Sequence, residues 1–153
     1  MTQENKDLLL KDLCARLPYG VKVQVDLQSD TYSPITCKVC SIEYAEPGSA
    51  FIGVETSLDT YNEFSEFLCK PYLFPFSSMT EEQYKEWCDL ESNPLDEILA
   101  KNANCEKMST LEHHLLIAKS LTDSVNYCYK NHFDIYGLIP MGLAIDATGK
   151  NIY

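Results

Sequence analysis

The sequence predicts an α+β protein: a small, bent antiparallel sheet, or an SH3-like or Sm-like barrel, with an N-terminal helix and a helical C-terminal half. Three observations lead to this prediction. Leucines recur at helical spacing near the start, short β-prone runs separated by turn residues follow up to residue 76, and helix patterns dominate from residue 77 on. The 153 residues are enough for a substantial core. We therefore expect a single domain over 1–153, with 1–76 as helix plus strands and 77–153 mainly helical.

The chain begins with an expected helix over Asn5–Leu17. Leucines at helical spacing form one face of it, whereas the charged Asp12 and Arg16 fall elsewhere. A proline and a glycine then stop the helix. The next run, Val21–Leu27, alternates strictly between apolar and polar residues, which is typical of a half-buried strand.

Three further strands are expected at Ile35–Tyr44, Ala50–Glu55 and Phe67–Phe74. The stretch between the last two, Thr56–Glu66, is polar and acidic, and the pattern assigns it no regular structure. A barrel built from such strands would protect its edges by near closure.

A helix start follows at the junction of the two halves. Thr80 and Gln83 have the spacing of a capping box, in which each side chain bonds the other residue's backbone N–H. Two glutamates in the first turn suit the positive end of the helix dipole. The pattern predicts a helix over Thr80–Leu90.

The sequence of the second half predicts two more helices and a strand that joins the sheet of the first half. Pro94–Ala100 has the spacing of a short helix. Ser109 and Glu112 form a second capping-box pattern, so a long helix is expected from there to about Lys130. A return strand is expected near residues 142–146. The long helix carries an apolar stripe that we expect to face inward: Leu111, Leu115, Ala118, Leu121 or Thr122, Val125 and Cys128.

Charge is unevenly distributed along the chain. The formal net charge is −11, and residues 51–112 hold 13 acidic but only 4 basic groups. Direct binding to a nucleic-acid backbone is not expected, because it needs a Lys/Arg surface. A protein with a basic surface is the expected partner, although an acidic run is more often a solvated face. In the unassigned acidic stretch, aromatic side chains would anchor such a partner while carboxylates steer it. The candidate partner-binding residues are Asp59, Tyr61, Glu63, Phe64 and Glu66.

The cysteines indicate a reducing compartment. There are 7 of them, an odd number without a disulfide framework, and the polar start of the chain predicts no secretory signal. Cys37 and Cys40 form a lone CxxC whose thiols would face opposite sides of a strand. We expect no metal and no cofactor. No apolar run is long enough to span a membrane, so no membrane association is expected.

A second group of candidate residues is the polar cluster His132, Asp134 and Tyr136. The first two have the types of a base and its orienting carboxylate, which leaves a hydrolase as the least favoured hypothesis. No nucleophile motif accompanies them, and the same residue types suit a helix end and turn, which is the preferred interpretation. An alternative function is small-molecule or nucleotide binding at a barrel mouth, where tyrosines would stack on a base: Tyr32, Tyr44, Tyr72 and Tyr136.

Three stretches resemble one family of small uncharacterised proteins from gut Bacteroidales and their phages and mobile elements. They are Leu8–Val21; Lys70–Glu82 with its Lys-Pro-Tyr-Leu, Ser-Ser-Met-Thr and Glu-Glu pieces; and Asn131–Ala147 with its His-Phe-Asp, Gly-Leu-Ile and Gly-Leu-Ala pieces. The chain departs from the family pattern at Pro140 and between residues 27 and 66. No activity is assigned to the family, so no catalytic residue is carried over. The resemblance implies a cytoplasmic protein of a bacterial host cell, encoded by a phage or prophage.

Together these observations favour a non-enzymatic interaction protein. The hypothesis is a small acidic protein that inhibits a host protein with a basic surface, such as one that acts on nucleic acids.

Overall fold

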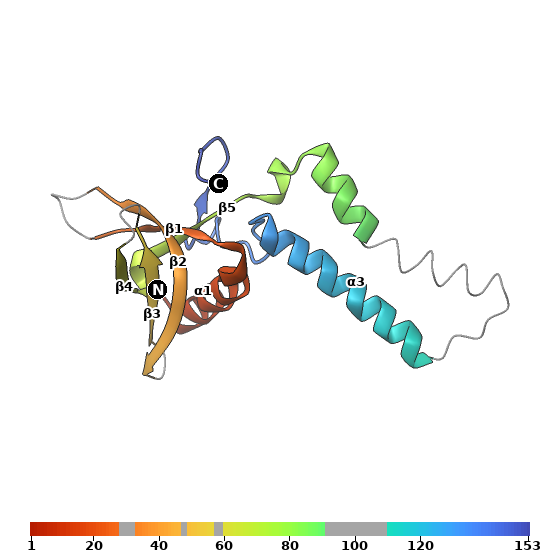
Figure 1. The fold of residues 1–153 in the computed structure, drawn as a ribbon, viewed down its shortest axis with the longest axis horizontal. Helices are drawn as coiled ribbons and strands as arrows, with labels where there is room; N and C mark the ends of the chain where they lie inside the picture. Colours follow the sequence, from red (N-terminus) through yellow and green to blue (C-terminus); the bar gives the residue numbers. More distant parts are fainter. Residues whose placement is uncertain (28–32, 47–48, 57–59, 91–109) are drawn as a thin grey trace. The chain divides into compact units, whose positions relative to one another are not determined.

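The structure is a computed structural model, and it describes residues 1–27, 33–46, 49–56, 60–90 and 110–153. It confirms the α+β class (Figure 1). The chain forms two compact units: Met1–Phe76 together with His132–Tyr153, and Ser77–Asn131. The second unit is thus an insertion in the sequence of the first. The expected single domain over 1–153 stays a prediction, although its internal boundary after residue 76 coincides with the start of the insertion.

The sheet of the first unit has six strands in the described part of the chain, in the order β4–β3–β2–β1–β5–β6. Their bounds are β1 (Lys22–Val25), β2 (Ile35–Glu46), β3 (Ser49–Glu55), β4 (Tyr61–Ser65), β5 (Cys69–Leu73) and β6 (Ile145–Asp146). Neighbouring strands are antiparallel, except that β6 runs parallel to β5. The sheet is therefore open and mixed, not a closed barrel. Register shifts at Val39/Ser41 and Tyr44/Glu46 accompany the curvature of β2 in Figure 1.

The stretch Thr56–Glu66, to which the sequence assigned no conformation, contains β4. It pairs with β3, with Phe64 opposite Ile52 and Glu63 opposite Gly53. Asn62 and Phe64 share the face of β4 that lies opposite Val54 and Ile52; Asn62 is exposed, and only Phe64 is apolar. Because the alternation has a single apolar member, the strand was not evident from the pattern.

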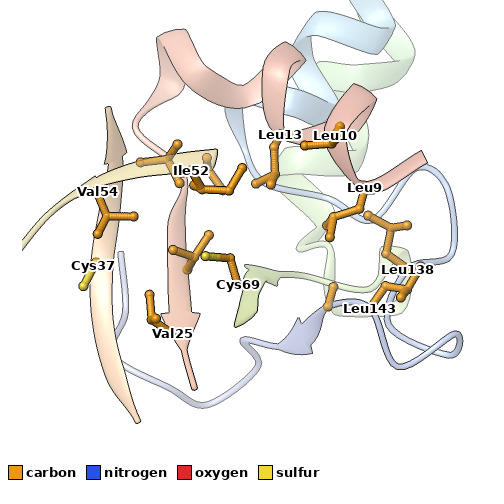
Figure 2. Packing of buried hydrophobic residues seen from close by; sticks show 14 of the residues in the cluster. Leu9, Leu10, Leu13, Val25, Cys37, Ile52, Val54, Cys69, Leu138 and Leu143 are labelled. Atoms are coloured by element: carbon orange, nitrogen blue, oxygen red, sulfur yellow. The ribbon is translucent and has the colours of Figure 1, made fainter. Parts of the chain in front are cut away.

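Helix α1 (Gln3–Arg16) packs its leucines against the sheet. Thr2 caps its first turn, since its hydroxyl accepts the N–H of Asn5 at 3.2 Å. A 3-10 turn, η1 (Leu17–Tyr19), then leads to Gly20, which takes the left-handed φ of 69° that ends the helix. Figure 2 shows the helix leucines facing buried strand residues. The buried apolar cluster includes Leu9, Leu10, Leu13, Val25, Cys37, Ile52, Val54, Cys69, Leu138 and Leu143.

A buried ion pair lies within this packing. Asp12 and Arg16, which the helical pattern placed off the apolar face, are both 0% exposed. Arg16 Nε donates to Asp12 Oδ2 at 2.7 Å, and Nη2 donates to Asp12 Oδ1 at 2.8 Å and to the Phe133 carbonyl at 2.6 Å. Burial raises the pKa of Asp12, and the neighbouring Arg16 guanidinium partly offsets this rise. The pair therefore joins α1 to the segment that returns after residue 131.

The second unit begins with the predicted capping box. Thr80 N–H donates to Gln83 Oε1 at 2.9 Å, and Gln83 N–H donates to the Thr80 hydroxyl at 3.2 Å. Residues 81–90 are helical. Helix α3 spans Thr110–Lys130. Ser109 and the expected helix at 94–100 lie outside the described residues.

The expectation that the apolar stripe of α3 faces inward is wrong for most of its members. Four of them are well exposed: Leu111 (67%), Leu115 (59%), Leu121 (58%) and Val125 (42%), whereas Cys128 is buried. The buried face instead carries Ser120, whose hydroxyl donates to the Leu90 carbonyl at 2.9 Å. The side chain of Tyr127 lies with it, its hydroxyl 3.2 Å from the Gln83 carbonyl. A helical period defines a face, but it does not say which face its neighbour covers.

Breaking the buried pair should cost much more than deleting a surface charge. Asp12→Ala leaves Arg16 buried without its counter-charge and is expected to lower the free energy of unfolding by about 3–5 kcal/mol. The double variant Asp12→Leu/Arg16→Met should cost less than the sum of the single changes. Urea denaturation measures these values, with Asp7→Ala on the exposed side of α1 as the control. A cost for Asp12→Ala as small as that of the control would contradict this account.

Removing the cap at Thr80 is expected to destabilise the second unit. Thr80→Ala leaves the Gln83 N–H without its acceptor and should cost about 1 kcal/mol. Thr80→Ser keeps the hydroxyl and serves as the control. The measurement is thermal unfolding followed by the helical circular-dichroism signal, and equal stability of the alanine and serine variants would show that the cap contributes nothing.

Candidate functional site: an acidic face of the sheet

One face of β2–β3–β4 carries an exposed set of carboxylates and aromatic rings. Ile52 and Val54 on β3 are buried in the core with the leucines of α1, so their neighbours in β3 point to the other side. The register places three cross-strand rows there: Lys38–Glu55–Tyr61, Ser41–Gly53–Glu63 and Glu43–Phe51–Ser65. We call the set Glu43, Phe51, Glu55, Tyr61 and Glu63 the acidic face. All five side chains are exposed, Phe51 at 43% and Tyr61 at 53%.

A tyrosine bridge organises this face. The Tyr61 hydroxyl lies 2.9 Å from Ser41 Oγ and donates to Glu63 Oε1 at 3.1 Å, so it accepts from Ser41. The ring crosses β3 at Gly53, where an added Cβ would lie 2.4 Å from the Tyr61 hydroxyl oxygen. Gly53 is required by this close approach, and the ring covers the gap that the missing side chain leaves. Tyr61 and Glu63 are thereby held in a defined arrangement.

The structure divides the predicted partner-binding residues. Tyr61 and Glu63 lie on the acidic face, and Asp59 lies outside the described residues. Phe64 points the other way, because side chains alternate along β4, and it is half-buried against the core.

Glu66 is not available to a partner. It is 1% exposed in the 3-10 turn η2 (Glu66–Leu68), and Lys6 Nζ of α1 lies 2.9 Å from its Oε1. The Ala50 N–H and the Ser65 hydroxyl donate to its Oε2. Burial favours a higher pKa for Glu66, but these hydrogen bonds outweigh it and lower the pKa. The turn after β4 thus places the Glu66 carboxylate in a buried position next to α1. The expectation that Glu66 is a surface residue that binds a partner is therefore wrong.

Three members of the acidic face were missed by the sequence analysis: Glu43, Phe51 and Glu55. A signal for two of them was present, because Phe51, Gly53 and Glu55 alternate with the apolar Ile52 and Val54. Glu43 joins them only through the β2–β3 register, in which it is opposite Phe51. Residues on different strands share a face through pairing that local sequence does not specify.

The polar cluster at residues 132–136 forms a turn. Asp134 accepts the N–H groups of Leu138 at 2.8 Å and Ile139 at 2.9 Å, one on each carboxylate oxygen. Its own N–H donates to the Phe74 carbonyl, and the Phe74 N–H donates to the His132 carbonyl. No hydrogen bond joins the His132 and Asp134 side chains in the part of the chain that the structure describes. Asp134 therefore shapes the turn and does not orient the imidazole.

His132 itself is buried in a strained backbone conformation. Its φ is 59°, its side chain is 7% exposed, and its ring stacks on Tyr153 with centroids 3.9 Å apart. Nδ1 is buried and has no hydrogen-bond partner among the described residues. Burial, together with the nearby Arg16 charge, lowers the pKa of His132 to about 4. The ring is thus neutral at physiological pH. Tyr136, the third residue of the cluster, is half-buried, with the Lys11 ammonium 5.2 Å from its ring centroid.

The described tyrosines of the expected barrel mouth do not form a binding site of that kind. The sheet is not closed, and Tyr72 is 5% exposed with its hydroxyl next to Gln24 and Thr36. Tyr44 is 69% exposed, and Tyr32 lies outside the described residues.

The CxxC thiols lie as the strand geometry predicts, with Cys37 buried and Cys40 exposed. Within the described ranges no three potential ligand residues gather in a way that could hold a metal ion. Burial raises the pKa of Cys69 to about 12, so this thiol is protonated. Of the helices in the described part, none is long and apolar enough to cross a membrane.

No family model matches the chain, and neither characterised proteins nor solved structures match it. The family resemblance of the three signature stretches stays a prediction.

The buried His132 should make the protein acid-sensitive. Above pH 6.5 the imidazole is neutral in both the folded and unfolded chains and contributes nothing to the pH dependence. As the pH falls from 6.5 to about 4, the unfolded chain binds a proton that the folded chain does not. Stability is therefore lost across that window, by up to about 3 kcal/mol.

His132→Asn removes the titrating group and tolerates the left-handed φ. Urea unfolding at pH 7 and pH 4.5 should show a smaller loss of stability for this variant than for the wild type. His113→Asn, at an exposed position of α3, is the control and should behave as the wild type. If the stability of His132→Asn depends on pH as strongly as that of the wild type, the prediction is wrong.

Proposed function

We propose that the chain is a non-enzymatic interaction protein whose acidic face binds a protein with a basic surface. One observation carries the proposal: three exposed carboxylates, Glu43, Glu55 and Glu63, share a strand face with two exposed aromatic rings. Within its three cross-strand rows the only basic side chain is Lys38, opposite Glu55.

The acidic face combines the two kinds of side chain that have different roles in a protein interface, aromatic rings and charged groups. Aromatic side chains supply buried area at low entropic cost, and Phe51 and Tyr61 are the exposed rings here. Carboxylates around them accelerate the encounter with a basic partner and disfavour acidic ones. The hydrogen bonds of the Tyr61 hydroxyl with Ser41 and Glu63 hold the ring before binding, which reduces the ordering cost on association.

The partner class follows from charge and from the family resemblance. Carboxylates repel nucleic-acid phosphates, so the partner is a protein and not the nucleic acid itself. A phage- or prophage-encoded protein in the cytoplasm of a bacterial host meets many basic proteins that act on nucleic acids. Inhibition of one of these is the function we propose.

Charge reversal on the acidic face should slow association. Glu43→Lys/Glu63→Lys leaves the Lys38–Glu55 row unchanged and should reduce the association rate at low salt by about tenfold, with a weaker salt dependence. The partner is first captured from host lysate with the wild-type chain, and the rate is then measured with the purified partner. Glu81→Lys/Asp89→Lys makes the same change in net charge in the second unit and should associate nearly as fast as the wild type.

Thermal unfolding establishes that both double variants are folded. If the face variant associates at the wild-type rate at low salt, the acidic face is a solvated surface only. If both variants slow equally, net charge and not the acidic face governs the encounter.

A further inference from the structure

Helix α3 exposes an apolar stripe on the side away from its neighbour in the second unit. The residues that contact helix 81–90, Ser120 and Tyr127, lie roughly 160–180° around the helix axis from Ala118. The stripe is centred on Ala118 and comprises Leu111, Leu115, Ala118, Leu121 and Val125. The packing between the two described helices of this unit therefore does not use the stripe.

The spacing of the stripe is symmetric about Ala118. Leu115 and Leu121 lie three residues before and after it, and Leu111 and Val125 lie seven residues before and after it. When two such helices run antiparallel about a two-fold axis at Ala118, each apolar residue meets another at the same height. Leu111 is then level with Val125 of the other copy, and Leu115 with Leu121 of the other copy. The mean spacing of 3.5 residues is that of closely packed helix pairs, and the small side chain at the centre permits close approach of the axes.

The exposed area also matches a helix pair. The four large stripe residues, with Ile117 at 38% exposure beside them, expose on the order of 500 Å² per copy, which is at the upper end for an apolar patch on a monomer. Two copies would bury on the order of 1,000 Å², the lower limit for a specific interface. A pair of this size forms reversibly and depends on protein concentration.

We propose that α3 pairs with α3 of a second copy of this chain, antiparallel about a two-fold axis at Ala118. Such an interface is isologous, so the same stripe serves both copies. The residues involved do not overlap with the acidic face, and the proposal does not rest on the proposed function.

Sedimentation velocity across a range of protein concentrations tests the pairing. The wild type should shift from monomer to dimer, and Leu115→Lys/Leu121→Lys should weaken self-association at least about tenfold. His113→Lys introduces the same side chain on an exposed position off the stripe and should dimerise as the wild type. Circular dichroism establishes that each variant keeps its helices, as expected for substitutions at exposed positions.

Cross-linking tests the position of the axis. In a background with Cys14, Cys40, Cys88 and Cys105 replaced by serine, Ala118→Cys should form a disulfide-linked dimer on mild oxidation, because Ala118 meets its own copy. Lys130→Cys, far from the axis, should not. A wild type that stays monomeric at all concentrations would overturn the proposal, and loss of fold in the lysine double variant would show that the stripe is covered within the chain. A dimer that the stripe variant leaves intact, or that links through Lys130→Cys, would place the interface elsewhere.

Discussion

The first unit depends on the buried ion pair between Asp12 and Arg16. Two charges lie one helical turn apart in the core, and each is fully removed from water. Their desolvation is offset only because the geometry is bidentate and because Arg16 also donates to the Phe133 carbonyl. That carbonyl belongs to the segment after the inserted helical unit. The full set of hydrogen bonds of Arg16 therefore forms only when this segment packs against α1. The pair thereby connects α1 to a segment 117 residues later in the chain.

The returning segment is fixed by a chain of further contacts around this pair. Phe133 bridges to Phe74, β6 adds to the edge of β5, and Ala147 N–H donates to the Leu73 carbonyl. The His132 ring, lying on Tyr153, closes the same region. In this turn the Asp134 carboxylate accepts backbone N–H groups, and the His132 ring fills space against Tyr153. Residue types that also occur in catalytic sites therefore have a structural role here.

Two surfaces are exposed among the residues that the structure describes, one in each unit. The acidic face combines exposed carboxylates, of which Glu63 is held by the Tyr61 hydroxyl, with exposed rings on a strand surface opposite the one that packs with α1. The stripe of α3 is apolar and lies opposite the helix face that its neighbour uses. The first surface is the one on which the proposed binding of a basic partner depends, and the second is the one on which the proposed pairing of two copies depends.

Local sequence by itself determined the elements whose signals lie within a few residues. The capping box at Thr80, the helix before Pro18 and the alternating strand β1 are of this kind, because their hydrogen bonds and periodicities are short-range. Tertiary structure decided the rest. It buried Glu66 under Lys6, and strand register gathered the acidic face. It also left the α3 stripe exposed. A periodic pattern specifies which residues share a face, but the contact that covers or exposes that face comes from chain segments far away in sequence.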